Sequence, residues 1–215
     1  GMQGWALRFD QAAGTVIFGG VQASFAAEPV FSFLDQTLPS GGGSVHFSPL
    51  TLSASIDASC GFTSSSGDID LPLFLQEASP IYLPLRAFRI HDAAVSPDHN
   101  CIGAYNAQTL DPGNGCLATP ESPAFSDGAT MEAFLPLEAA DQVMVSILQR
   151  SLCAFLVESP EYVDEGSPAK CKRDASGAIV FHGDWCSATN QPAEPGCADA
   201  LHFSAGFAAA GVKLQ

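Results

Sequence analysis

The sequence predicts a mainly β fold, a sandwich or barrel of antiparallel strands with one short α-helix and long disulfide-tied loops. Short segments of alternating apolar and polar residues recur along the chain, and segments rich in Gly, Pro, Asn and Asp separate them. A single segment has apolar residues at helical spacing. Several short strands, irregular connections and one helix are typical of sandwiches and small barrels.

The length and composition favour one domain, residues 1–215, over two small ones. A chain of 215 residues can bury about 70% of its unfolded surface in a single core. Charged residues make up 14% of the chain, against about 25% in an ordinary soluble domain. Gly, Ala, Ser and Thr replace them, a composition common among exported β-rich proteins.

Four stretches carry the strand pattern. Alternation runs loosely through 7–33 and resumes in 45–56. It continues through 69–95, where Pro72 and Pro84 indicate edge or interrupted strands. The C-terminal ALHFSAGFAAAGVKL predicts a closing strand, whereas 96–128 and most of 158–200 have the composition of loops.

The predicted helix covers about residues 137–150. Glu138 and Asp141 in its first turn and Arg150 near its last complement the helix dipole. The apolar residues at helical spacing are Ala140, Val143, Met144, Ile147, Leu148 and Leu152.

The charge balance argues against two classes of partner. With 8 basic and 23 acidic residues the net charge is −15, which repels nucleic-acid phosphates and anionic lipid headgroups. The sequence contains no apolar run of the about 18 residues that a membrane-spanning helix needs. The opening GMQGW has neither the basic nor the apolar segment of a signal peptide. The expected partner is an envelope component or a neutral ligand.

The cysteines predict disulfides and an oxidising compartment. None of the 7 cysteines forms a C-x-x-C pair, so zinc-ribbon and thioredoxin-like sites are not expected. Two of the expected bridges enclose turn-rich loops, and one ties the helix end to the irregular segment after it. The predicted bridges are Cys101–Cys116, Cys153–Cys171 and Cys186–Cys197, with Cys60 as a free thiol.

Motifs of the common catalytic and cofactor-binding classes do not occur. GGGSVH and TSSSGD place serines near glycines without completing G-x-S-x-G. The chain also lacks H-E-x-x-H, the Walker A motif and G-x-G-x-x-G. We therefore expect no cofactor and assign no catalytic residue.

Two polar segments offer ligands for a metal ion. Asp68 and Asp70 in SGDID would give calcium two carboxylates, without the other ligands of an EF-hand loop. HDAAVSPDHN offers imidazole and carboxylate ligands suited to zinc: His91, Asp92, Asp98 and His99. Turns with capping carboxylates explain both segments more simply, so we predict no tightly bound metal.

Asp184 is a candidate for glycosidase chemistry, which needs two carboxylates at a cleft, one with a raised pKa. The adjacent Trp185 would stack on a sugar ring and desolvate the carboxylate. The second carboxylate is not identifiable among 23 acidic residues. A tryptophan buried beside the Cys186–Cys197 disulfide is the simpler interpretation.

Several cysteine-centred segments carry a resemblance: NCIGAYNAQTLDPGNGC, SLCAFL, GDWCSATNQPAEPGC and the C-terminal GFAAAGVKL. Together they resemble uncharacterised cysteine-containing envelope proteins of predatory and soil bacteria, often exported as lipoproteins. The resemblance covers about the last 115 residues and implies export and shared disulfides. It implies no activity, cofactor or catalytic residue.

The function we expect is that of a secreted or envelope-anchored binding or structural module without catalytic activity. The first alternative is an extracellular hydrolase acting on glycan or another neutral polymer, and the second is a carrier of an apolar ligand. A deep pocket with two convergent carboxylates would favour the hydrolase, and a long apolar cavity would favour the carrier.

Overall fold

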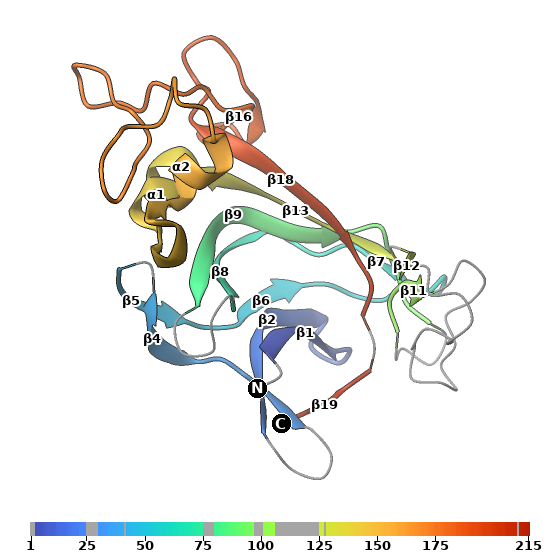
Figure 1. Ribbon diagram of the computed structural model, residues 1–215. Helices are drawn as coiled ribbons and strands as arrows, with labels where there is room; N and C mark the ends of the chain where they lie inside the picture. The colour runs from blue at the N-terminus through green and yellow to red at the C-terminus, as the bar shows by residue number, and fades with distance from the viewer. Residues whose placement is uncertain are drawn as a thin grey trace.

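The computed structural model is sandwich-like, with two β-sheets enclosing a common core and two short helices at one end (Figure 1). It describes residues 3–24, 30–40, 42–74, 80–96, 101–105, 125–126, 128–209 and 211–215. The mainly β fold that the alternating segments predict is confirmed.

The first sheet is built around the long strand β2. It contains β1 (Gln3–Asp10), β2 (Thr15–Ser24), β3 (Val30–Phe33), β6 (Leu50–Ser53) and β19 (Lys213–Leu214). β1 pairs with one edge of β2, while β6 and β3 pair with successive parts of the other edge. β19 lies parallel to β3, so the C-terminal segment joins the N-terminal sheet (Figure 1).

The second sheet is antiparallel and carries the candidate site. Its order across the sheet is β17 (Gln191–Pro192), β16 (Trp185–Cys186), β18 (Ala200–Phe207), β13 (Ala129–Pro136), β9 (Ile81–His91) and β8 (Gly67–Leu73). β8 is an edge strand and contains Pro72, as expected for a residue that cannot donate to a neighbouring strand. The closing strand predicted for ALHFSAGFAAAGVKL is confirmed only in its first part, β18, because β19 belongs to the first sheet.

Four two-stranded pairs complete the described strands. They are β4 (Gln36–Ser40) with β5 (Gly43–Phe47), β7 (Gly61–Phe62) with β10 (Ala93–Ala94), β11 (Ala104–Tyr105) with β12 (Phe125–Ser126), and β14 (Met144–Val145) with β15 (Arg150–Ser151).

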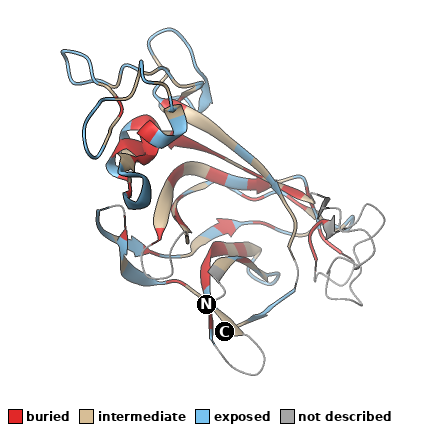
Figure 2. Cartoon of the chain, in the orientation of Figure 1, coloured by how far each residue is buried: buried red, intermediate tan, exposed pale blue. Residues whose placement is uncertain are grey.

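The core lies between the two sheets, where Figure 2 shows the buried positions concentrated. Phe18 of β2 and Phe88 of β9 stack across it with ring centroids 4.8 Å apart. Leu52 of the first sheet and Leu71 and Leu85 of the second are almost inaccessible to solvent. Because a fully buried side chain of this size contributes about 1.5–3 kcal/mol, these contacts hold the two layers together.

The predicted helix at about 137–150 is wrong beyond its first turns. α1 covers Leu137–Gln142, a 3₁₀ turn follows at Ser146–Leu148, and a second helix, α2, covers Leu152–Val157. α1 ends because Val143 is extended, and Val143 and Val145 then alternate into the core as in a strand. Ile147 is 66% exposed, so the helical spacing did not mark one buried face. Among the described residues, neither helix is long and apolar enough to span a membrane.

Disulfides hold the irregular segments that follow α1. The structure contains Cys153–Cys171 and Cys186–Cys197, with the pairing that the sequence predicts, and Cys60 is a free thiol. Cys101 is also disulfide-bonded. Its predicted partner, Cys116, lies outside the described residues.

Candidate functional site

Polar side chains gather on the outer face of the second sheet, away from the core. Strand alternation puts them there, because Phe88 and Ile90 of β9 and Met131 of β13 point into the core. The neighbours of these residues must point the other way. The outward group consists of Arg89 and His91 from β9, Glu132 from β13 and His202 from β18.

This face is hollowed into a pocket of about 340 Å³, which we call the outer-face pocket. Its size falls at the lower end of the about 300–1,000 Å³ typical of ligand sites. The outer-face pocket is lined by Ser66, Ala87, Arg89, Glu132, Ala133, Trp185, Asn190, Gln191 and His202.

Glu132 is the centre of the polar network. Arg89 donates to its Oε2 through Nε at 2.8 Å and also through Nη2. The Nε2 atom of His202 lies 3.1 Å from Oε1, and that of His91 lies 3.5 Å from Oε2. Burial opposes ionisation of Glu132, but these hydrogen bonds and the nearby charges outweigh it and hold the pKa of Glu132 below its usual value. Glu132 is therefore a carboxylate at neutral pH.

Trp185 forms the aromatic wall of the pocket. Its ring stacks on the imidazole of His202 with centroids 4.4 Å apart and an interplanar angle of 23°. Its Nε1 donates to Oδ1 of Asn190 at 3.0 Å, which fixes the plane of the indole. One ring edge is thus held by the β16–β17 turn and one ring face by β18.

A disulfide and two hydrogen bonds hold the turn that contains Asn190 and Gln191. The Cys186–Cys197 disulfide closes it, and Asp199 accepts hydrogen bonds from the backbone N–H and the hydroxyl of Ser187. Burial opposes ionisation of Asp199, yet these bonds keep its pKa below the usual value. The clamp predicted for 186–197 therefore positions two residues of the pocket.

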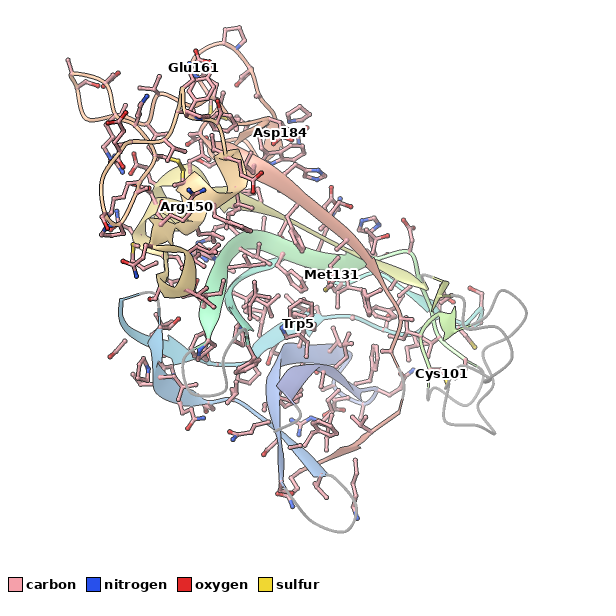
Figure 3. The ribbon with its side chains drawn as sticks, in the orientation of Figure 1. Trp5, Cys101, Met131, Arg150, Glu161 and Asp184 are labelled. Atoms are coloured by element: carbon pink, nitrogen blue, oxygen red, sulfur yellow. A yellow bond between two sulfur atoms is a disulfide. The ribbon has the colours of Figure 1, made fainter. Side chains whose placement is uncertain are left out.

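Asp184, the glycosidase candidate, lies at the end of the second sheet beside β18 (Figure 3). Its Oδ1 accepts the backbone N–H of His202 at 2.7 Å. The carboxylate thus anchors the start of β18 and does not line the outer-face pocket. The adjacent Trp185, which the sequence analysis paired with Asp184, does line the pocket.

The candidate metal ligands that the structure describes are Asp68, Asp70, His91 and Asp92. Asp68 and Asp70 face Arg86, with Asp70 Oδ1 3.1 Å from Arg86 Nη1, and Asp68 also accepts the backbone N–H of Ala87. Both aspartates lie in β8, so these contacts join β8 to β9 and are not the turn caps that the sequence predicts. His91 contacts Asp92 at 2.7 Å. Asp98 and His99 lie outside the described residues.

Two clusters of potential metal ligands occur in the part of the chain that the structure describes. One contains Asp141 and the other Asp199, each with a pair of cysteines. In both, the cysteines are joined in a disulfide, so their sulfur atoms cannot act as thiolate ligands.

Sequence reasoning missed Glu132, Arg89 and His202 as a group. Alternation in RAFRIH and ALHFSAGF puts Arg89 on one strand face with His91, and His202 on one strand face with Ser204. In MEAFL, Glu132 is a single charged residue in an apolar segment. The pairing of β13 with both β9 and β18 brings them together, and this pairing connects residues more than 40 positions apart.

Comparison with known proteins gives this site no precedent: no protein-family model, curated protein or solved structure matches the chain at a significant level.

Proposed function

We propose that the protein is an exported, non-catalytic binding module that recognises a neutral carbohydrate in the outer-face pocket. The observation that carries the proposal is the pairing of an oriented indole with polar groups that still have bonding capacity. Within the described residues, the Nδ2 group of Asn190, the amide of Gln191 and Nη1 of Arg89 have no hydrogen-bond partner. Amides and guanidinium donors suit hydroxyl groups, and the apolar face of a sugar ring packs on an indole.

The charge of the pocket favours a neutral ligand. The positive charge of Arg89 is balanced by Glu132, whose lowered pKa keeps it ionised. The whole chain carries a net charge of −15, which repels anionic ligands at long range. A neutral sugar is not repelled by the net negative charge, and it does not compete with Glu132 for Arg89.

Binding is better supported than hydrolysis at this site. A glycosidase acid must keep its proton near neutral pH, which requires a raised pKa. In the part of the chain that the structure describes, the carboxyl groups whose pKa is displaced all have it lowered: Asp57, Glu132, Asp174 and Asp199. Among the described residues, no hydroxyl group is hydrogen-bonded to His91 or His202 as an activated nucleophile would be.

Export is supported by the disulfides and by the resemblance of the cysteine-centred segments to exported envelope proteins. Two disulfides fit an oxidising extracellular compartment. A location at the cell envelope would place the pocket among glycans, which is consistent with the proposed ligand.

A screen of neutral glycans with purified protein tests the proposal. We expect saturable binding to at least one glycan, weakened about five- to tenfold by Asn190→Ala and by Gln191→Ala, because each removes a hydrogen-bonding amide. His46→Ala is the control, since His46 lies on the β4–β5 hairpin and pairs with Asp35. The proposal is wrong if the glycans do not bind, if Asn190→Ala and Gln191→Ala both bind as well as the unmodified protein, or if His46→Ala weakens binding as much as they do.

A further inference from the structure

A second and larger cavity, of about 690 Å³, runs along one edge of β1, and residues 5–9 of the strand all line it. Successive side chains of a strand point to opposite faces, so a single space bordered by five consecutive residues runs along their backbone. The other edge of β1 pairs with β2, and among the described residues β1 pairs with no further strand. We call this space the β1 cavity.

The far wall of the β1 cavity belongs to the other end of the same sheet. The order of the first sheet is β1-β2-β3-β19, so β1 and β19 stand at its two ends (Figure 1). Leu214 of β19 lines the cavity, as do Val212 and Ile102, and the backbone of Ile102 pairs with that of Ala209. The first sheet therefore curves so that both of its end strands border one cavity.

The backbone of β1 contributes polar groups to this lining. In an antiparallel pair, every second residue directs its N–H and C=O towards the neighbouring strand, and the residues between direct theirs away from it. β1 pairs with β2 in one unbroken register over all 8 of its residues. Beyond this pairing, the described part of the chain contains no backbone–backbone hydrogen bond to β1. The outer edge of β1 thus presents donors and acceptors about 7 Å apart, the repeat of an extended chain.

β1 lacks the protection that the edges of the second sheet have. Proteins shield exposed edges with prolines, lysines, bulges and very short strands, because an open edge accepts a further strand. The edge strands β8 and β17 contain Pro72 and Pro192, and β17 has only 2 residues. β1 contains no proline, lysine or register shift, and its Arg8 lies over the Phe33 ring on the face of the sheet. The edge of β1 is therefore open to pairing.

We propose that the β1 cavity binds an extended peptide segment of a partner protein, which pairs with β1 as an additional strand. Backbone pairing of this kind provides affinity, and the side chains that alternate along the peptide provide specificity. With about 3.4 Å per residue, 4.8 Å between strands and 10 Å between layers, a volume of 690 Å³ holds about four strand residues. The site lies on the first sheet, so it does not depend on the proposed carbohydrate binding.

The walls favour a peptide in which apolar and polar residues alternate. One face of the added strand continues the face of Leu7 and Phe9, which pack against the core, and it meets the buried Ile102. Apolar side chains on that face would be removed from water. The other face continues that of the exposed Arg8, where polar side chains remain solvated.

A second copy of this chain fits the β1 cavity less well than a single peptide strand. Its β1 would bring the paired β2 with it, and Val212 and Leu214 close the space that β2 would need. The cavity therefore selects one isolated strand.

Trp5 makes peptide binding directly measurable. It lines the cavity and is 41% exposed, and Trp185→Phe leaves it as the single indole of a chain with 2 tryptophans. The hexapeptide TVTVTV with blocked ends, titrated into this variant, should produce a saturable change in indole emission. The same peptide N-methylated at its two central residues keeps its side chains but loses one N–H on each edge. It should bind at least about tenfold more weakly.

A substitution at the far wall tests the position of the peptide. Val212 is 50% exposed in the cavity, so Val212→Lys, which puts a charge where the peptide packs, should weaken binding about tenfold. Val180→Lys is the matched control, because Val180 is 37% exposed and lines neither the β1 cavity nor the outer-face pocket.

Three results of these titrations would overturn the proposal: an absent emission change, equal binding of the N-methylated peptide, or equal losses of affinity in Val212→Lys and Val180→Lys. Sedimentation of the unmodified protein adds a fourth. A concentration-dependent dimer that Val212→Lys abolishes would assign the edge of β1 to a second copy of the chain and contradict the proposed partner.

Discussion

Glu132 determines the chemistry of the outer-face pocket because side chains from two other strands bind its carboxylate. Arg89 and His91 approach from β9 and His202 from β18, so both carboxylate oxygens are occupied. A carboxylate bound in this way orients its neighbours and is poorly placed to donate a proton. The ion pair with Arg89 is partly exposed, which limits its contribution to stability.

Glu132→Gln should lower the free energy of unfolding by up to about 1 kcal/mol at pH 7. The folded-state pKa of Glu132 lies below its ordinary value of 4.5, so its contribution is present above that pH and is lost as the pH falls through the folded-state pKa. Urea denaturation at pH 7 and pH 3 should show a difference between the two proteins that shrinks with acidification. Glu161→Gln, at an exposed position, is the control. A difference that does not depend on pH would contradict the assigned role.

Asp141 is a buried carboxylate with a structural role. It is fully buried and accepts hydrogen bonds from the Ser151 hydroxyl at 2.7 Å, the Cys171 backbone N–H at 2.9 Å and Arg173 Nη2 at 2.9 Å. These bonds connect α1 to the start of α2 and to the Cys153–Cys171 disulfide. Hydrogen bonds with Glu138 and Asp141 in turn raise the pKa of Arg173 further above its usual value.

Asp141→Ala should destabilise the protein by about 3–5 kcal/mol, because it leaves three buried or partly buried donors without their acceptor. Glu138→Ala provides a matched comparison, since Glu138 also binds Arg173 but its side chain is 57% exposed. Its loss should cost less than about 1 kcal/mol. Thermal denaturation of both variants checks the prediction. Equal losses of stability in the two variants would show that the burial of Asp141 does not make its contacts with Arg173 more stabilising than those of Glu138.

At the scale of elements, the close backbone contact between Gly183 and the start of β18 positions Trp185, the aromatic wall of the pocket. The backbone N–H of Gly183 donates to the carbonyl oxygen of Ala198 at 2.7 Å. A Cβ atom at Gly183 would lie 1.8 Å from the carbonyl oxygen of Ala200. Because that contact is with backbone, no side-chain rotation relieves it, and β16 must shift away from β18 together with Trp185.

Gly183→Ala should therefore destabilise the protein by at least about 1–3 kcal/mol and weaken ligand binding in the outer-face pocket. Gly4→Ala in β1 is the control, because a Cβ there would meet nothing within 4 Å. Circular dichroism melts and a binding titration of the two variants separate the effects. Unchanged stability of Gly183→Ala would contradict the close approach of the two segments.

The elements show where sequence patterns succeed and where they fail. Alternation predicted the sandwich and its closing strand because each strand buries one face. The spacing of Val143, Met144 and Ile147 fitted a helix, but β-branched residues entering the core made the chain extended there. The pocket was not predictable as a group because it depends on which strands are neighbours, and a single sequence does not reveal the pairing of β13 with β9 and β18.

For the whole molecule, covalent links supplement the core in the C-terminal half, where much of the chain is irregular. Non-reducing peptide mapping should find Cys153–Cys171, Cys186–Cys197 and the predicted Cys101–Cys116, with Cys60 alone alkylated. Bridges that close loops of this size contribute about 3 kcal/mol each in the chain-entropy model. A peptide linking Cys60 to another cysteine would contradict this connectivity.

The chain has 2 tryptophans, and Trp185 lines the outer-face pocket whereas Trp5 lies in β1 and does not. Trp5→Phe leaves Trp185 as the single indole and changes no residue of the outer-face pocket. The most direct test of carbohydrate recognition is a fluorescence titration of this variant with the best neutral glycan from the screen. We predict a saturable change in Trp185 emission that is absent when Trp185→Phe, with Trp5 retained, is titrated with the same glycan. Saturable binding without a response from Trp185, or an equal response from Trp5, would place the ligand elsewhere and contradict the proposed function.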